Sequence, residues 1–223
     1  MRGIVLACGN SQSPLITEGD GFAVRTVPPR PGKAEVDPVL TDVGDGRLVV
    51  VGTDADLNAV VLRLLRTDRL TEVAVGYVPV EPRSEVARLW GLPTDPGHAL
   101  DLARSGEADR VPLVRDDVGG VLVGLGSLGP VRGVGYCDDT VVLRGQAGRL
   151  EVTPDPDGGL GLVVRVIQKR LLRRKVEVTA GRAFQLGCLP VEVTSDGHAH
   201  PRPMGKWTWY RHTEDLRLVR GLA

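Results

Sequence analysis

The segment Val49-Val-Val-Gly-Thr-Asp-Ala-Asp-Leu-Asn58 contains the residue types best suited to binding a phosphorylated ligand. An apolar run ends at Gly52, and the carboxylates of Asp54 and Asp56 follow directly. This pattern predicts a buried strand, a tight turn and the first turn of an amphipathic helix. Such a turn presents backbone amides and the positive end of the helix at the carboxyl edge of a parallel sheet, where phosphates bind. The segment therefore indicates a phosphate-binding turn.

A second group of charged residues lies in Lys169-Arg-Leu-Leu-Arg-Arg-Lys175, which has five cations in seven residues. In a helix, Arg170, Arg173 and Arg174 would form one continuous face that suits an anionic lipid or a phosphate. The simpler interpretation is a solvated basic surface. Binding to anionic vesicles that weakens with added salt would distinguish the two.

Two further patterns suggest known kinds of site but lack the context that those sites need. Gly124-Leu-Gly-Ser-Leu-Gly129 has the glycine spacing of a dinucleotide-binding turn, yet Pro130 and further glycines follow it instead of a helix. His198 and His200, with Cys188 nearby in the sequence, could ligate a metal, but neighbouring prolines favour a solvated loop. We therefore predict neither a dinucleotide site nor a zinc site from these residues.

The composition excludes several classes of protein. The chain has 223 residues, and its 28 Lys and Arg balance its 28 Asp and Glu, so no overall basic field points to nucleic acid. Hydrophobic residues make up 42%, which is enough for a packed core. Three separated cysteines without a Cys-x-x-Cys pattern argue against a disulfide framework. No apolar run approaches the roughly 20 residues of a membrane span, so we expect a cytoplasmic protein, and scarce lysine and asparagine suit a GC-rich bacterial genome.

The elements that would position the phosphate-binding turn alternate between strands and helices. We expect strands at residues 4–7, 47–52 and 72–80, and helices at 54–66, 84–90 and 95–106. Residues 9–38 are expected to be poor in structure, because their prolines remove amide donors and restrict the preceding residues. The βαβα order predicts a largely parallel sheet covered by helices.

From residue 111 the pattern changes to short strands separated by turns. The turn Asp116-Asp-Val-Gly-Gly120 indicates a hairpin. Further strands are expected at residues 140–144, 149–153, 160–167, 175–179, 190–194, 206–211 and 216–219. We therefore predict an α/β domain at residues 1–110 and an antiparallel β-sandwich at residues 111–223, with a last strand that could return to the first domain.

The phosphate-binding turn resembles the Gly-Gly-Asp-Gly-Thr-Leu-Asn turn of the diacylglycerol kinase, sphingosine kinase and NAD kinase superfamily. Four positions are shared, namely Gly52, Asp54, Leu57 and Asn58. Thr53 and Ala55 replace two of the glycines, and Asp56 replaces the threonine. The likeness therefore includes the central Asp of the turn and the first of its three glycines, but not the other two.

The resemblance continues in the same order along the chain. Residues 78–93 are similar to the lipid kinases' Pro-Leu-Gly-Thr-Gly-Asn-Asp-Phe-Ala-Arg loop, with Pro79, Ala87 and Arg88 shared and Glu85 a conservative replacement. Ser84 lies where the glycine-threonine-glycine turn has been lost.

The second half of the chain also resembles this superfamily. Residues 148–164 are similar to the β-sandwich segment that precedes its basic helix, and Asp196 stands where the family has an acid. The glutamate that neighbours this acid in the family is replaced by His198. The resemblance implies the fold of these kinases, which is an α/β domain followed by a β-sandwich.

The resemblance also implies an activity, the transfer of the ATP γ-phosphoryl group to the hydroxyl of a lipid or another small acceptor, assisted by Mg²⁺. Asp54 would act at the nucleotide and metal site, and Asp196 would take the hydroxyl proton. The implied nucleotide-binding residues, which would line a cleft between the domains, are Gly52, Thr53, Asp54, Asp56, Asn58, Ser84 and Glu85. The basic segment with Arg170, Arg173 and Arg174 would contact an anionic membrane peripherally, and a homodimer is compatible with this scheme.

The departures from the family pattern define two alternatives. Side chains at Thr53 and Ala55 narrow the turn, and Asp56 adds a negative charge that repels a polyphosphate unless a divalent ion intervenes. The first alternative is therefore a non-catalytic pseudokinase module that binds a nucleotide or a lipid. The second is an NAD kinase-like enzyme, although the chain lacks the Asn-Glu pair that NAD kinases use. In each case we expect nucleotide binding to be weak and dependent on Mg²⁺.

Overall fold

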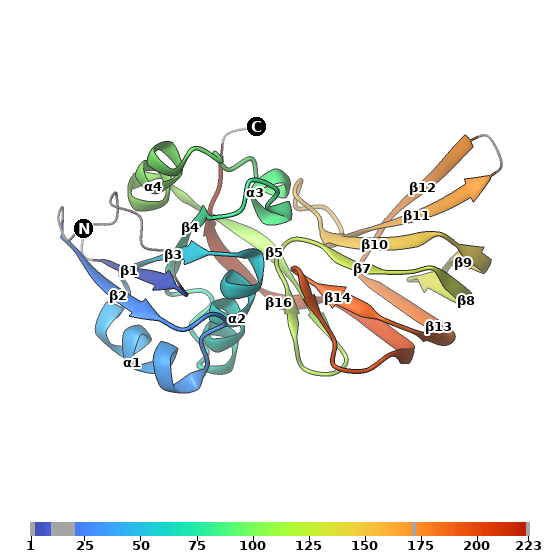
Figure 1. The fold of residues 1–223 in the computed structure, drawn as a ribbon, viewed down its shortest axis with the longest axis horizontal. Coiled ribbons are helices and arrows are strands. Elements are labelled where there is room, and N and C mark those ends of the chain that lie inside the picture. Colours follow the sequence, from blue (N-terminus) through green and yellow to red (C-terminus); the bar gives the residue numbers. More distant parts are fainter. Residues whose placement is uncertain (1–2, 10–20, 171–172, 222–223) are drawn as a thin grey trace. The chain divides into compact units, whose positions relative to one another are not determined.

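The computed structural model describes residues 3–9, 21–170 and 173–221 (Figure 1). The chain divides into two compact units, one formed by Met1–Val111 with Glu214–Ala223 and the other by Pro112–Thr213. We describe each unit by itself. Among the described helices, none is long and apolar enough to cross a bilayer.

The first unit is built on a parallel sheet. Its strands are ordered β2 (Phe22–Val27), β1 (Gly3–Cys8), β3 (Arg47–Gly52) and β4 (Ala74–Pro79), and the end of β16 (Met204–Val219) pairs in parallel with β4 at Leu218 and Val75. Every residue of β1, β3 and β4 is buried, which explains their continuous apolar runs, because helices cover both faces of such a sheet.

Four helices accompany this sheet, α1 (Lys33–Val43), α2 (Asp54–Arg66), α3 (Glu85–Leu89) and α4 (Pro96–Ser105). The side chains of α4 pack on one face, where Ala99, Leu100 and Ala103 join the core around Val49 and Val51 of β3. The approach is close at Gly76 of β4, where an added Cβ would lie 2.4 Å from the Ala103 carbonyl oxygen. Helices α1 and α2 lie on the opposite side of the sheet (Figure 1).

The expectation that residues 9–38 are poor in structure is wrong where the structure describes them. Strand β2 pairs with β1 along its whole length, and α1 continues through Pro38. Burial of the α1 residues Val36, Val39, Leu40 and Val43 at helical spacing outweighs the helix-breaking effect of this proline. The ion pair of Arg63 with Asp37 further ties α1 to α2, with both donor–acceptor distances at 2.8 Å.

The second unit is a β-sandwich. One sheet contains the strand order β16, β13 (Ala183–Val191), β8 (Val131–Cys137) and β9 (Thr140–Ala147). The other has the order β12 (Arg173–Gly181), β11 (Leu162–Arg170), β10 (Arg149–Pro154), β7 (Gly126–Leu128), β14 (Val193–Ser195) and β15 (His198–Ala199). Buried residues of both sheets, among them Leu143, Leu150, Val164 and Trp209, share one core. The hairpin predicted at Asp116 joins β5 (Ala108–Asp116) to β6 (Val121–Leu122). The predicted fold class, an α/β part with an antiparallel β part, is confirmed.

The described residues of the basic segment, 169–170 and 173–175, lie in paired strands and not in the helix that would place its arginines on one face. Strands β11 and β12 pair without interruption up to Lys169 with Arg174 and Arg170 with Arg173. The alternating β-branched residues that precede and follow the segment extend the ladder into it. The continuous helical face of Arg170, Arg173 and Arg174 therefore does not form, and residues 171–172 lie outside the described part of the chain.

Candidate functional site

The phosphate-binding turn has the strand–turn–helix geometry that the sequence predicts. Strand β3 ends at Gly52, and Thr53 is the N-cap of α2. The Thr53 hydroxyl accepts a hydrogen bond from the Asp56 amide at 3.3 Å, and the Asp56 carboxylate accepts from the Thr53 amide at 2.8 Å and from its hydroxyl at 2.9 Å. This reciprocal arrangement is a capping box. The spacing of Thr53 and Asp56 is itself a signal of such a box in the sequence.

The Asp56 carboxylate lies beside Gly52, at the positive end of α2. A Cβ added to Gly52 would be 2.6 Å from an Asp56 carboxylate oxygen, so glycine is needed there to admit this side chain. The other oxygen accepts a hydrogen bond from the Arg30 amide at 2.6 Å, and Asp56 is only 3% exposed. The turn therefore holds an anion of its own where a helix end would favour a bound phosphate.

Asp54 connects this turn to the turn after β4. One carboxylate oxygen accepts hydrogen bonds from the Tyr77 hydroxyl at 2.9 Å and the Ser84 hydroxyl at 2.5 Å. The other accepts from the amides of Glu85 at 2.8 Å and Val86 at 3.3 Å. Four hydrogen bonds use the whole accepting capacity of a carboxylate. Asp54, which is 8% exposed, thus acts as a clamp that holds the start of α3 against the start of α2.

The structure brings together most of the residues that the sequence assigned to this site. Ser84 is the N-cap of α3, and its hydroxyl accepts from the Ala87 amide at 2.9 Å while donating to Asp54. The Glu85 carboxylate does not face the turn but pairs with Arg88 at 2.6 Å. Asn58 is half-buried in the second turn of α2.

Two residues of this cluster, Tyr77 and Arg30, were not predicted from the sequence. The Tyr77 hydroxyl binds both Asp54 and, at 3.1 Å, the carbonyl oxygen of Gly52. A tyrosine in the otherwise aliphatic β4 was a usable signal, because a buried tyrosine hydroxyl needs a partner. Arg30 contributes only its backbone amide, for which no signal exists. Burial, and to a lesser extent the Asp56 charge, raises the pKa of the Cys8 thiol at the end of β1 to about 12, so it is no nucleophile near neutral pH.

Asp196, the predicted base, lies in the second unit in a turn after β14. Its carboxylate accepts hydrogen bonds from the amides of Val123 at 2.8 Å, Gly124 at 2.7 Å and Leu125 at 2.9 Å, and its own amide donates to the Leu125 carbonyl oxygen at 2.9 Å. Asp196 is 1% exposed. A general base must reach the proton that it removes, whereas this carboxylate is directed at amides of its own chain and fixes the start of the glycine-rich segment at residues 124–129.

Of the two histidines predicted to be loop residues, His198 is instead the first residue of β15, and His200 follows that strand. The His200 ring makes an edge contact with Trp207 at 5.3 Å between centroids, and its Nδ1 lies 2.9 Å from the Arg202 carbonyl oxygen. Burial raises the pKa of the Cys188 thiol, which donates to the Met204 carbonyl oxygen at 3.6 Å. Within the described ranges, no group of three or more His, Cys, Asp or Glu side chains is arranged to hold a metal ion.

Comparison with known proteins gives matches of structure only. No protein-family model and no curated protein sequence matches the chain. The structure is similar to a diacylglycerol kinase from Bacillus anthracis str. Sterne, with 10% identity, 99% of this chain and 97% of that chain covered, and a TM-score of 0.67. It is also similar to an NAD kinase from Archaeoglobus fulgidus in complex with ATP, with 14% identity, 99% and 94% covered, and a TM-score of 0.61. The chain has the diacylglycerol kinase and NAD kinase fold. A yeast NADH kinase complexed with NADH follows at 9% identity, with 100% and 84% covered and a TM-score of 0.56.

Within this kinase fold, the turn after β3 does not fit Mg²⁺ or a polyphosphate in its present arrangement. Mg²⁺ takes oxygen ligands in near-octahedral geometry, but both Asp54 oxygens are already engaged by four donors. The Asp56 carboxylate fills the space beside Gly52 and faces any incoming phosphate with like charge. A ligand would have to break the clamp, the capping box or both.

Proposed function

We propose that the protein is a non-catalytic member of the diacylglycerol kinase and NAD kinase fold group, a binding module in which phosphoryl transfer has been lost. The observation that carries this proposal is the closure of the phosphate-binding turn by the chain's own carboxylates. Asp56 caps the helix whose end would hold a phosphate, and Asp54 is committed to the β4–α3 turn. The fold is retained, but the Asp54 and Asp56 carboxylates, which would contact ATP and Mg²⁺ in an active kinase, stabilise the folded chain instead.

The energetic argument has two parts. A hydrogen bond to a charged group contributes about 1.5–3 kcal/mol, so freeing Asp54 for a metal would forfeit several such contributions. A phosphate oxygen about 4 Å from the Asp56 carboxylate would be repelled by about 4 kcal/mol at an effective dielectric constant near 20. Both effects oppose nucleotide binding at this turn. Thr53 and Ala55 replace two glycines of the superfamily pattern, so no wider turn offsets either effect.

The second candidate is an active ATP-dependent kinase that phosphorylates the hydroxyl of a lipid or another small acceptor. The observation that favours it is that Asp54 joins the same two turns that the sequence resemblance assigns to the nucleotide site. In this scheme Asp54 would release α3 when Mg²⁺ and ATP bind, and Asp196 would leave its three amides to act as the base. Each step breaks hydrogen bonds of a buried carboxylate, so we consider this candidate second.

The deciding experiment reopens the turn. The double variant Ala55→Gly with Asp56→Thr restores one of the two lost glycines and the threonine of the superfamily pattern. Isothermal titration with ATP and Mg²⁺ should show no binding, or millimolar binding, by the parent and at least tenfold tighter binding by the variant. Ala59→Gly is the matched control, because it adds a glycine to α2 without touching the turn.

A second experiment measures phosphorylation of diacylglycerol in mixed vesicles with radiolabelled ATP. The proposal expects no phosphorylated lipid from the parent above a protein-free blank. Turnover by the parent that disappears in both Asp54→Asn and Asp196→Asn would overturn the proposal and establish the second candidate.

A further inference from the structure

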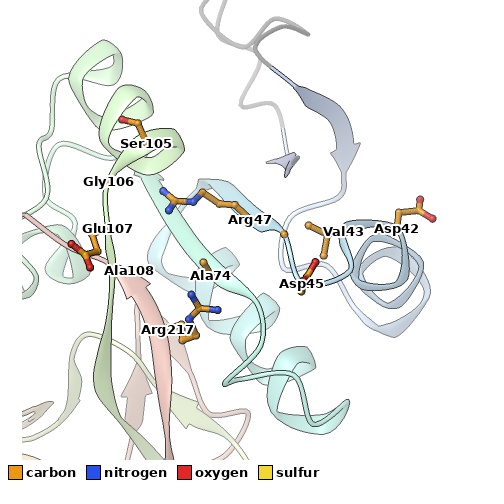
Figure 2. Close-up of a pocket in the computed structure, with 11 residues that line it drawn as sticks. Asp42, Val43, Asp45, Arg47, Ala74, Ser105, Gly106, Glu107, Ala108 and Arg217 are labelled. Carbon is orange, nitrogen blue, oxygen red and sulfur yellow. The ribbon is translucent and has the colours of Figure 1, made fainter. Parts of the chain in front are cut away.

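A cavity of about 720 Å³ lies at the opposite end of β3 from the phosphate-binding turn (Figure 2). The first residues of β3 and β4, the turn after α1, the end of α4 with the turn that follows, and β16 form its walls. Because β3 runs from Arg47 to Gly52, the cavity and the turn are separated by about 17 Å along the strand. The cavity is therefore distinct from the site already described.

Arg47 forms part of the cavity wall and carries a charge that the chain does not neutralise. The residue is 3% exposed, and its Nη1 donates to the Ala103 carbonyl oxygen at 3.0 Å. Its Nε has no hydrogen-bond partner, and among the described residues no carboxylate forms an ion pair with it. A buried cation without a counter-charge is costly. Burial and, to a lesser extent, the charge of Arg217 accordingly lower the pKa of Arg47.

Arg217 adds a second guanidinium to the same cavity. One of its nitrogens donates to the Glu72 carbonyl oxygen at 2.6 Å, while the Glu72 carboxylate is engaged with Arg69 at 2.9 Å. Figure 2 shows the guanidinium groups of Arg47 and Arg217 with Ala74 between them. Two neighbouring guanidinium groups repel each other when alone, and an oxyanion bound between them would relieve that repulsion while accepting charge-assisted hydrogen bonds.

The acidic residues of the cavity restrict what can enter. Asp42, Asp45 and Glu107 line it as well, and all three are exposed. Asp42 lies 3.8 Å from Arg25, which partly offsets its charge. Exposed carboxylates beside the buried arginines repel a highly charged ligand such as ATP more than a small anion with one or two charges.

We propose that this cavity is a binding site for a small oxyanion, a carboxylate or a phosphate of low charge, held between Arg47 and Arg217. This site does not involve the phosphate-binding turn. The protein would therefore bind an anion in this cavity although the turn is closed. The two chemical sources, carboxylates and phosphates, are distinguished by testing succinate and inorganic phosphate separately.

The test measures thermal unfolding of the full chain with inorganic phosphate or succinate, at an ionic strength kept constant with sodium chloride. A ligand that binds the folded state raises the unfolding midpoint by several degrees when it is well above its Kd. We expect such a rise for the parent with at least one of the two anions. Arg217→Gln should weaken the apparent affinity at least tenfold, whereas Arg66→Gln, an exposed arginine of α2 outside the cavity wall, should behave as the parent.

A direct measurement decides the proposal even if Arg217→Gln folds poorly. Equilibrium dialysis of the parent with radiolabelled phosphate and, separately, with radiolabelled succinate should show about one bound anion per chain for at least one of the two, displaced by sulfate and not by ATP. Absence of binding for both phosphate and succinate, or equal binding by Arg217→Gln and the parent, would overturn the proposal. A failure of Ala55→Gly with Asp56→Thr to bind ATP would leave the proposal untouched, because that result concerns the other end of β3.

Discussion

The Asp54 clamp makes a quantitative prediction about stability. In Asp54→Ala the amides of Glu85 and Val86 and the hydroxyl of Ser84 lose their acceptor. The Tyr77 hydroxyl loses one of two, because the Gly52 carbonyl oxygen still accepts from it at 3.1 Å. Removing one partner of a buried hydrogen bond costs about 1–3 kcal/mol for each group left unsatisfied. Solvent can reach part of this site, and the Ser84 hydroxyl still accepts from Ala87, so we expect a total loss of about 4 kcal/mol.

The conservative variant Asp54→Asn should lose about half as much. Its amide oxygen can still accept from the two backbone amides, and its NH₂ group can donate to the two hydroxyls, so only the benefit of charge disappears. At about 2–4 °C for each kcal/mol in a chain of this size, the midpoint should fall by roughly 8–16 °C in Asp54→Ala and by roughly half of that in Asp54→Asn.

Scanning calorimetry measures these shifts, with Asp95→Ala as the control. Asp95 is the N-cap of α4 in the same unit and accepts a single amide hydrogen bond, from His98 at 3.0 Å. Its loss should cost about 1 kcal/mol. Hydrogen exchange at the Glu85 and Val86 amides gives a local measure of the same contact. If Asp54→Ala costs no more than Asp95→Ala and exchange at these amides is unchanged, the Asp54 clamp is not a stabilising contact.

Three other predictions concern separate parts of the chain. Asp196→Ala should destabilise the sandwich unit by about 3 kcal/mol or more, measured by urea unfolding, because three buried amides lose their acceptor. Alkylation of Cys8 at pH 8 should be far slower in the native protein than in urea, since the pKa of this thiol is raised from 9.0 to about 12. For the same reason stability should fall as the pH rises from about 9 toward 12, where only the unfolded chain ionises at Cys8, and Cys8→Ala should reduce that fall. Arg173→Glu with Arg174→Glu should weaken sedimentation with anionic vesicles in low salt if the basic hairpin contacts membranes, and equal binding by variant and parent would remove the hairpin from that role.

Local signals predicted a large part of the fold. Strand β3, helix α2 and helix α4 were predictable because apolar spacing and caps such as Asp95 coincide within a few residues. Strands β7 and β8 were missed, because the glycines of this region conceal its strand pattern. Gly133 of β8 has a structural reason, since a Cβ there would lie 2.1 Å from the Gly187 carbonyl oxygen of β13. That reason exists only once residues far apart in the sequence have paired.

The candidate site shows the same division between local and distant contacts. The strand–turn–helix geometry at Gly52 was predictable from adjacent residues. The hydrogen bonds that decide its chemistry were not, because they join Asp54 to Ser84 and Asp56 to Arg30 across distances in sequence that carry no local signal. The structure of the basic segment at residues 169–175 was hard to predict for a related reason. Its arginine spacing suits a helical face, but the strand pairing of residues on either side of it outweighed that spacing.

The closed turn implies that stability and nucleotide binding should change in opposite directions. The Asp56 capping box stabilises α2 by about 1 kcal/mol or somewhat more, and the same carboxylate repels a polyphosphate. In Ala55→Gly with Asp56→Thr, the added glycine costs up to about 1 kcal/mol in the helix and the lost cap adds to that cost. The double variant should therefore unfold at a midpoint several degrees lower than the parent while it binds ATP with Mg²⁺ more tightly. Ala59→Gly should show the loss of stability without the gain in binding. A double variant that is destabilised and still binds no ATP would show that the turn is blocked by more than Asp56, and the proposal that the Asp56 carboxylate prevents nucleotide binding would then be wrong.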